Sequence, residues 1–585
     1  MTDPGTSRSG AHPEPGARPE PGAHAGDRTT ARDARPPDGR DGRSAQGRDA
    51  RPSTGRDRNV RWIGLAGAVS LAVAGYLGGA LPDTSTARSS GNGPLAVALW
   101  LLGTAAMVGA WWALRGGAPS TRWAYVTAGL WALPLLVTAP LGSRDVYSYA
   151  CQGWVYADGG DPYITGVAAA GCPWLDTVAP VWRDTPAPYG PFFVLLAALA
   201  VVLGGGLVGT VLLLRLLAVA GLVVAAACLP GLARAGGVPA RRATWLLLAC
   251  PLVGVHLVAG AHNDAVMLGL LLPALLLVTR RPARPGLLLP GRPWVVLVAG
   301  VLLGLAVSVK VTAVVVVPFA ALAAVRGQPR VATLLRDGGP LLVGVLGGLV
   351  APSLLTGLGP GWLGGLSRSG DTVQWTSPST AVGMVVDYAG DLFGRHPDAV
   401  PITRAAGLLL LATFLLTLWR HTWTTSRRPN TPTPSPTRPT SLIMKLLPSA
   451  SVFQGNNFMI NAAGVGLAAT VVLSPVFHPW YATWPLAVLA VSASRTGWFV
   501  LPCAVVSFLA LPDGTNVARL VKAPGAVAMT VLVLAAALWA LRRPSRPGRP
   551  SRRGRPPRPP RPGRPSRLGR PPRPPAGPSE WNSDR

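Results

Sequence analysis

Residues 294–325, WVVLVAGVLLGLAVSVKVTAVVVVPFAALAAV, decide the fold class of this chain. Lys310 is their one charged side chain, and it separates two apolar runs at 294–309 and 310–325. A helix rises about 1.5 Å per residue, so about 20 apolar residues cross a hydrocarbon core. Only helices or closed barrels satisfy their own backbone hydrogen bonds in lipid, and no alternation of apolar and polar residues indicates a barrel. The stretch therefore predicts helices embedded in a membrane.

Similar apolar runs recur along most of the chain, and their lengths predict an all-α polytopic membrane protein with about 13–15 transmembrane helices. Some runs are short, so broken or tilted helices are expected among them. The runs are 61–82, 94–114, 122–141, 190–206, 207–232, 243–260, 262–279, 294–309, 310–325, 338–356, 403–420, 458–475, 480–495, 497–511 and 523–541.

The composition agrees with this interpretation. Hydrophobic residues make up 49% of the 585 residues and charged residues 13%, whereas about 25% of the residues of a soluble protein are charged. A single soluble globule, a secreted disulfide scaffold and a purely disordered chain are excluded.

The formal net charge of +30 raises the question of nucleic-acid binding. Residues 542–585 contain 14 Arg and two acidic residues in Arg-Pro repeats, which favour extended, solvated chain. No aromatic residues interleave with these arginines, so we expect membrane lipids rather than nucleic acid as the partner of this tail. Residues 1–60 lack large apolar side chains and include no signal peptide, and we predict disorder there as well.

The arginines between the apolar runs predict the orientation. Basic connections lie inside the cell by the positive-inside rule, which places both tails and the loop 421–457 in the cytoplasm. Residues 61–541 then form a multi-pass domain of the plasma membrane, and its loops 142–189 and 357–402 face the outside of the cell. One conflict remains, because 190–232 must cross an odd number of times but contains two apolar runs.

The outer loop 142–189 starts with Arg144 and Asp145 directly after an apolar run. A carboxylate at the membrane surface is partly desolvated, which raises its basicity and suits deprotonation of an alcohol. The alternative is a helix-end surface ion pair between Arg144 and Asp145, which would contribute little stability.

Three polar residues, His262, Asn263 and Asp264, interrupt the apolar runs at one predicted helix-to-helix turn. Asn263 or Asp264 could cap the following helix through its side chain. His262 is not needed for a cap, and the free amides at a helix start attract phosphate. The turn thus predicts either a cap or a phosphate contact.

Two further features predict contacts to an anion at the same face. Lys310 is one of only three lysines, and it either snorkels to the surface or binds a phosphate. His478 lies between helices in a rigid turn, next to Trp480, Tyr481 and Trp484, which we interpret as an interfacial aromatic belt. The orientation places Asp145, His262, Lys310 and His478 together on the outer side.

Cys151 and Cys172 both lie in the loop 142–189, where an oxidising environment makes a disulfide plausible. No Cys or His spacing matches a zinc site, and no phosphate-binding glycine motif follows a strand. We expect no metal site and no cofactor; whether a divalent cation is needed stays undecided.

The chain resembles a known family in the order of its polar motifs. Ser-Arg-Asp-Val-Tyr-Ser-Tyr at 143–149, Asp-Pro-Tyr at 161–163, Pro-Tyr-Gly-Pro at 188–191, His-Asn-Asp at 262–264, the Lys310 stretch and His-Pro-Trp-Tyr at 478–481 occur in the same order in the actinobacterial polyprenol-phosphomannose-dependent α-1,6-mannosyltransferases of lipomannan assembly. That family has the GT-C glycosyltransferase fold, and the resemblance covers about residues 61–540.

The resemblance implies an enzyme that takes mannose from polyprenyl-phosphate-mannose and adds it to a glycolipid or α-1,6-mannan acceptor. In the family an acidic residue of the first large external loop is the catalytic base, and Asp145 matches it; the reaction then inverts the anomeric centre. Candidate contacts to the donor phosphate or sugar are Arg144, Tyr147, Tyr189, His262, Asn263, Asp264, Lys310 and His478. A transporter or flippase, or a GT-C transferase of another prenyl-phosphate sugar, stays an alternative.

Overall fold

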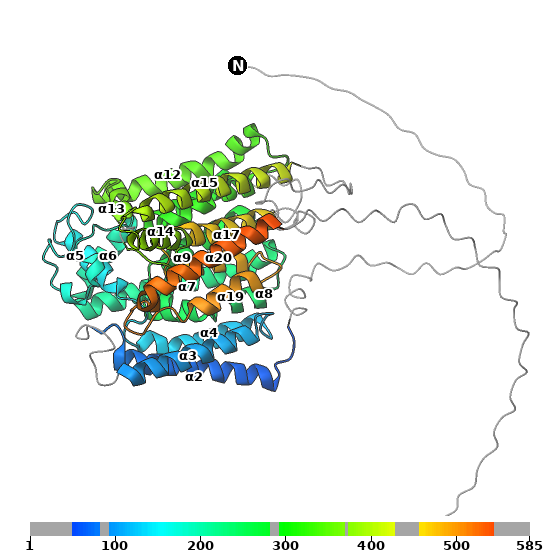
Figure 1. Cartoon of the computed structure of the whole chain (residues 1–585). Helices are drawn as coiled ribbons and strands as arrows, with labels where there is room; N and C mark the ends of the chain where they lie inside the picture. The colour runs from blue at the N-terminus through cyan, green and yellow to red at the C-terminus, as the bar shows by residue number, and fades with distance from the viewer. Residues whose placement is uncertain (1–49, 82–92, 281–291, 369–371, 428–455, 543–585) are drawn as a thin grey trace, which may run out of the picture.

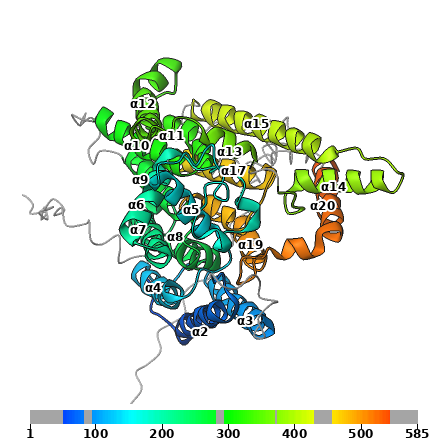
Figure 2. The ribbon, with the colours of Figure 1, turned by 90° about the vertical axis from the view of Figure 1, so that its left-hand side faces the viewer.

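The computed structural model describes residues 50–81, 93–280, 292–368, 372–427 and 456–542 (Figure 1). Within these ranges the chain is helical and has no strand, apart from one isolated bridge between Ala510 and Asn516. Many of the long helices run side by side along one direction in Figure 1. Figure 2 views the molecule from the α5 end, and there α14 extends sideways from the bundle beside α15 and α20.

Each of the apolar runs predicted from the sequence contains helix. The helices are α2 (Gly55–Gly78), α3 (Gly93–Ala113), α4 (Thr121–Val137), α5 (Asp145–Ala157), η1 (Leu175–Thr177), η2 (Pro180–Trp182), α6 (Pro191–Gly204), α7 (Leu207–Ala235), α8 (Ala240–Leu248), η3 (Val253–Ala259), α9 (Asp264–Thr279), α10 (Arg292–Val309), η4 (Val311–Val316), α11 (Val317–Ala324), α12 (Val331–Thr356), α13 (Trp362–Arg368), α14 (Pro378–Asp391), α15 (Ala399–Ser426), α17 (Asn456–Leu473), η7 (Pro479–Ala482), α18 (Thr483–Ala490), α19 (Gly497–Val506), η8 (Val517–Val521) and α20 (Lys522–Arg542).

The helices confirm an all-α polytopic membrane protein. In the described part of the chain, six helices are long and apolar enough to cross a membrane, and the bent pair α8 and η3, with 64° between its halves, could form a seventh span. The remaining apolar runs fold into shorter helices, such as α6, α9 and α17. The apolar runs therefore outnumber the full-length spans, because several runs form helices that are too short or too bent to cross alone.

The conflict over residues 190–232 has a simple explanation in helix length. α6 has 14 residues, or about 21 Å of helix, which is less than the roughly 30 Å of a hydrocarbon core. α7 has 29 residues and is long enough. α6 lies beside α5 at one end of the bundle (Figure 1). By length, only α7 counts as a crossing.

Glycines bring α10 and α12 close together, and Lys310 directly follows the last residue of α10. Gly300 and Gly304 on α10 meet Gly344 and Gly348 on α12, and a Cβ on any of the four would overlap the backbone of the facing helix. In lipid there is little hydrophobic force between helices, so such close backbone packing is a main source of association.

Two predicted boundaries change. α2 starts at Gly55, where Thr54 and Asp57 form a capping box and Arg51 contacts Asp57 at 2.7 Å; the prediction that disorder extends to residue 60 is therefore wrong for 55–60. α15 extends to Ser426 and α17 starts at Asn456, which shortens the predicted loop 421–457. Residues 1–49, 428–455 and 543–585, which hold the rest of the tails and of this loop, lie outside the described residues.

Candidate active site

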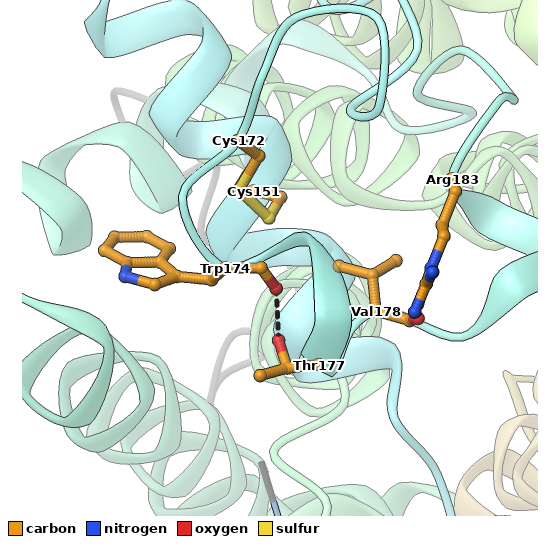
Figure 3. The surroundings of a disulfide bond; sticks show 6 residues. All are labelled: Cys151, Cys172, Trp174, Thr177, Val178 and Arg183. Atoms are coloured by element: carbon orange, nitrogen blue, oxygen red, sulfur yellow. Dashed lines mark hydrogen bonds between the residues drawn. A yellow bond between two sulfur atoms is a disulfide. The ribbon is translucent and has the colours of Figure 1, made fainter. Parts of the chain in front are cut away.

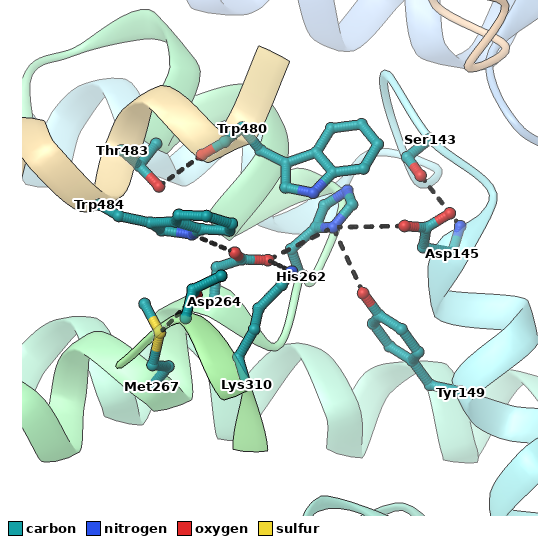
Figure 4. A network of polar contacts seen from close by, with 11 residues as sticks. Ser143, Asp145, Tyr149, His262, Asp264, Met267, Lys310, Trp480, Thr483 and Trp484 are labelled. Carbon is teal, nitrogen blue, oxygen red and sulfur yellow. Dashed lines mark hydrogen bonds and ion pairs between the residues drawn. The ribbon is translucent and has the colours of Figure 1, made fainter. Parts of the chain in front are cut away.

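Five segments that are far apart in the sequence meet at the α5 end of the bundle. They are the start of α5, the turn between η3 and α9, the residue after α10, the turn before η7, and α18. Figure 4 shows Asp145, His262, Asp264 and Lys310 together with Trp480 and Trp484. The sequence placed Asp145, His262, Lys310 and His478 on one face of the membrane, and the structure brings all four into one polar cluster.

Asp145 is the first residue of α5, where the helix dipole favours negative charge. Its backbone N–H donates to Ser143 Oγ over 3.0 Å, and 12% of its side chain is exposed. Burial raises the pKa of Asp145 to about 6, while the charge of Lys310 and a hydrogen bond with Ser143 oppose this shift. A carboxylate with that pKa, still open to solvent, is suited to act as a general base near neutral pH.

His262 is fully buried beside Asp145. Its Nδ1 lies 3.8 Å from Asp145 Oδ2, 3.9 Å from Asp264 Oδ2 and 3.4 Å from the hydroxyl of Tyr149. Burial, reinforced by His256 and Lys310, lowers the pKa of His262 well below its usual value. His262 is therefore neutral at physiological pH, and in the predicted phosphate or sugar contact it can act only as a hydrogen-bond partner.

Asp264 and Lys310 form the ion pair of the cluster. Lys310 Nζ donates to Asp264 Oδ2 over 2.8 Å, and Trp484 Nε1 donates to the other carboxylate oxygen. The Lys310 ammonium also lies 5.1 Å and 5.4 Å from the ring centroids of Tyr481 and Trp484, within the range of cation–π attraction. Lys310 therefore has the partner that a charge in an apolar run requires, and 11% of its side chain remains exposed.

His478 stacks on Trp480 with ring centroids 4.6 Å apart and 11° between the planes. The His262 ring also packs on Trp480, with 4.2 Å between the ring centroids. Burial, followed by the charges of Lys310 and Arg519, lowers the pKa of His478 to about 3, so this histidine is also neutral. The prediction of a lipid-facing aromatic belt is wrong for Trp480 and Trp484, because both rings are buried within the cluster.

The other predicted contacts lie around this cluster. Tyr189 is partly buried, its ring meets that of Tyr149 edge-on with 5.3 Å between centroids, and its carbonyl accepts a hydrogen bond from the Tyr163 hydroxyl. Asn263 precedes α9 but makes no capping bond, so that interpretation is wrong. Both polar atoms of its side chain are buried, with no hydrogen-bond partner among the described residues.

Arg144 and Tyr147 bond to backbone carbonyls. The Arg144 guanidinium donates to Thr177 O and Leu81 O at 3.2 Å and 3.1 Å, and the Tyr147 hydroxyl donates to Ala80 O at 2.6 Å. These bonds tie the start of α5 to the end of α2 and to the loop, so we assign both side chains to positioning Asp145. The Arg144 guanidinium thus binds backbone carbonyls, which argues against the alternative of a simple surface ion pair between Arg144 and Asp145.

Arg215 of α7 was missed by the sequence analysis although its charge stands in an apolar run. It is buried and donates to the carbonyls of Leu136, Thr138 and Ala259 at 2.7–2.8 Å. Ala259 ends η3, three residues before His262. Arg215 thus holds the turn that carries His262 against the end of α4.

Arg519 was missed as well. It is exposed, and its charge acts on His478. The signal was present in the sequence, because Arg519 lies in a connection between two apolar runs, at 497–511 and 523–541, that the sequence analysis did not use.

The loop after α5 is closed by a disulfide between Cys151 and Cys172 (Figure 3). Across the described ranges, no group of three or more His, Cys, Asp or Glu side chains could hold a metal ion. The cluster can therefore offer a largely buried carboxylate that keeps 12% of its side chain exposed, one paired ammonium and neutral imidazoles to a substrate.

Comparisons with known proteins identify relatives of this arrangement. Residues 61–326 match the family described as alpha-(1->6)-mannopyranosyltransferase, N-terminal domain, and residues 443–539 match the MptB C-terminal domain. Alpha-(1->6)-mannopyranosyltransferase Rv1459c of Mycobacterium tuberculosis is 31% identical over 72% of this chain and 74% of its own. Alpha-(1->6)-mannopyranosyltransferase B of Corynebacterium glutamicum is 30% identical over 71% and 67%, and alpha-(1->6)-mannopyranosyltransferase A of M. tuberculosis is 29% identical over 73% and 79%. No solved structure is significantly similar.

Proposed function

Because this chain belongs to the alpha-(1->6)-mannopyranosyltransferase family and is a membrane-embedded mannosyltransferase, we propose that it transfers mannose from polyprenyl-phosphate-mannose to an α-1,6-mannan or glycolipid acceptor. The reaction inverts the anomeric centre, Asp145 is the general base, and the architecture is the GT-C type that the resemblance implies. The observation that carries the proposal is Asp145 itself: a carboxylate with a pKa of about 6, partly exposed, in a cluster that also contains Lys310.

The proposed step forms one bond and breaks one. The acceptor hydroxyl gives its proton to Asp145, and its oxygen attacks the anomeric carbon of the donor mannose. The bond from that carbon to the phosphate oxygen breaks, and polyprenyl phosphate leaves with the electron pair. Attack opposite to the leaving group converts a β-linked donor into an α-mannoside, and no nucleotide sugar takes part.

Lys310 is the residue best suited to stabilise the leaving phosphate. An ammonium group has three N–H donors, and Asp264 takes one of them. The others can contact phosphate oxygens, where negative charge increases as the bond breaks. The pair with Asp264 keeps the ammonium in place within an otherwise apolar surrounding. His262 and His478, both neutral, would bind sugar hydroxyls or phosphate oxygens as hydrogen-bond partners rather than as cations.

We further propose that the cluster faces the outside of the plasma membrane and that both tails are cytoplasmic. Arginine placement supports this orientation, and so does the Cys151–Cys172 disulfide in the loop beside the cluster, because disulfides persist in oxidising compartments. A lipid-linked donor would then present its headgroup at this boundary.

The test is transfer of labelled mannose from polyprenyl-phosphate-mannose to an α-1,6-mannoside in membranes that contain the full chain. We expect transfer by the wild type, its loss in Asp145→Asn, and partial activity in Asp145→Glu, which keeps a carboxylate. The anomeric configuration of the product reports inversion. Transfer only from another prenyl-phosphate sugar would refute the donor, and equal activity of wild type and Asp145→Asn would refute the base.

A further inference from the structure

The loop closed by the Cys151–Cys172 disulfide contains a pocket of about 320 Å³. Its walls include the side chains of Trp154, Asp158 and Thr165 and the residues Gly159 and Gly160. Every residue that lines the pocket lies between the two cysteines. The disulfide therefore closes a short loop that carries a pocket of its own, and none of the lining residues belongs to the Asp145 cluster.

The backbone of this unit is held by more than the disulfide. Gly160 N–H donates to Val155 O over 2.8 Å, and Thr165 N–H donates to Asp161 O over 3.0 Å. Gly159 has φ +87°, a left-handed conformation that favours glycine and lets the chain turn sharply at the end of α5. The backbone around the pocket is thus fixed by hydrogen bonds within the loop.

The lining indicates what kind of ligand fits. It contains no Lys or Arg, and Asp158 is acidic, so a phosphate is disfavoured. One carboxylate is too few for a protein metal site, and the walls are too polar for a lipid tail. What remains is a neutral, hydroxyl-rich ligand with one apolar face, in short a sugar. Its hydroxyls could bond to Asp158 and Thr165, and its C–H face could pack on the Trp154 indole.

The position of the pocket indicates which sugar. Trp154 follows Asp145 by nine residues of α5, about 14 Å and two and a half turns, so it lies on the opposite side of the helix. The donor mannose must reach Asp145 and cannot occupy this pocket at the same time. An acceptor with several linked hexoses extends well beyond its reacting end and can reach other parts of the loop.

We propose that this pocket is an acceptor exosite, which binds a hexose unit of the mannan chain away from the reacting hydroxyl. The inference rests on the proposed function for the identity of the sugar, while the pocket and its lining are independent of it. An exosite of this kind makes the enzyme prefer long acceptors over short ones, because only a long chain occupies both sites at once.

The test compares Trp154→Ala with wild type in full-length protein reconstituted in lipid nanodiscs. Transfer is measured with a short and a long α-1,6-oligomannoside acceptor. We expect the preference for the long acceptor, expressed as the ratio of the two kcat/KM values, to fall about tenfold, as for loss of an aromatic anchor. Trp154→Phe should restore most of the preference. Ile164→Ala is the matched control, because Ile164 is 78% exposed in the same loop and does not line the pocket.

Binding provides a second readout that needs no catalysis. Long oligomannoside should bind to the Asp145→Asn protein and should bind at least about tenfold more weakly when Trp154→Ala is added. Transfer by the wild type together with a Trp154-independent acceptor preference would overturn the exosite alone. Trp154-dependent binding without any mannose transfer would overturn the proposed function and leave the exosite standing. Oligomannoside binding that is equal with and without Trp154→Ala overturns the exosite.

Discussion

The turn at Asp145 and the turn at Asp264 place two carboxylates on either side of His262, at nearly equal distances of 3.8 Å and 3.9 Å from its Nδ1. Their surroundings differ. Asp264 is completely buried, and its two oxygens are occupied by Lys310 and Trp484. Asp145 keeps 12% of its side chain exposed, and its carboxylate contacts no ammonium in the way that Asp264 does.

The difference teaches that two chemically identical groups acquire different roles from what surrounds them. A carboxylate already bound by an ammonium and an indole N–H holds structure and fixes the lysine. A carboxylate with a raised pKa and an open side can accept a proton. Substitution of Asp145 should therefore affect mainly catalysis, whereas substitution of Lys310, the partner of Asp264, should affect mainly stability.

The largest expected effect is on catalysis at the first turn. Asp145→Asn should lower the transfer rate by about 10³-fold, because a general base contributes about 10²–10⁴-fold. The thermal stability of the purified protein should change little, because the amide fills nearly the same volume. The measurement pairs labelled-mannose transfer with a melting curve in detergent. A protein that loses stability as much as activity would show that Asp145 is structural, which would remove the contrast with Asp264.

The next effect concerns stability at the second turn. Lys310→Met leaves Asp264 as a buried carboxylate without its cation, which should destabilise the protein by about 3–5 kcal/mol. Adding Asp264→Asn removes the unpaired charge, so the double variant should recover much of that stability. Denaturant or thermal unfolding of the two single variants and the double variant gives the coupling energy. Additive effects would show that the 2.8 Å contact contributes nothing, and that the two turns differ less than their geometry indicates.

The contrast also shows what could be predicted from sequence. Asp145, His262 and Lys310 stood out because charged and polar residues are rare in apolar surroundings, and arginine placement put them on one face. Their partners could not be predicted: the contact of Trp484 with Asp264 joins residues 220 positions apart, and Tyr149 reaches His262 from a different helix.

The charge of the histidines is a further example. The sequence suggested that His262 and His478 contact the donor phosphate or sugar, but it did not show the charge of either imidazole. Only the tertiary structure shows that His262 is buried and His478 partly buried, and that this desolvation lowers the pKa of each. In the same way, hydropathy located α6 correctly as an apolar helix but could not show that it has only 14 residues and packs against α5.

A smaller effect is expected from pH. The carboxylate form of Asp145 is the active base, and its pKa is raised to about 6 by burial. Activity therefore rises with pH up to about 6 and then levels off, falling about tenfold per unit below that value. If Asp145 were fully solvated, activity would begin to fall only near pH 4. The pH dependence of kcat/KM of the wild type reports the pKa of this group in the free enzyme, and Asp145→Glu should shift the pH at which kcat/KM falls. A fall in activity near pH 4, or a fall at a pH that Asp145→Glu does not change, would contradict the assignment of Asp145 as the desolvated base.

The smallest effect should come from Arg519, which lies outside both turns. Its charge acts on His478 from an exposed position, where water screens most of the interaction. Arg519→Gln should raise the KM for the anionic donor only a few-fold, with kcat nearly unchanged, because an exposed cation attracts donor and leaving group about equally. The effect should shrink further as salt is added, whereas the effect of Lys310, shielded among Asp264 and the aromatic rings, should persist. Donor KM values measured at low and high salt for Arg519→Gln and Lys310→Gln make that comparison. If the two variants respond alike to salt, Lys310 is as open to water as Arg519, and the buried ion pair does not distinguish the second turn from the surface around it.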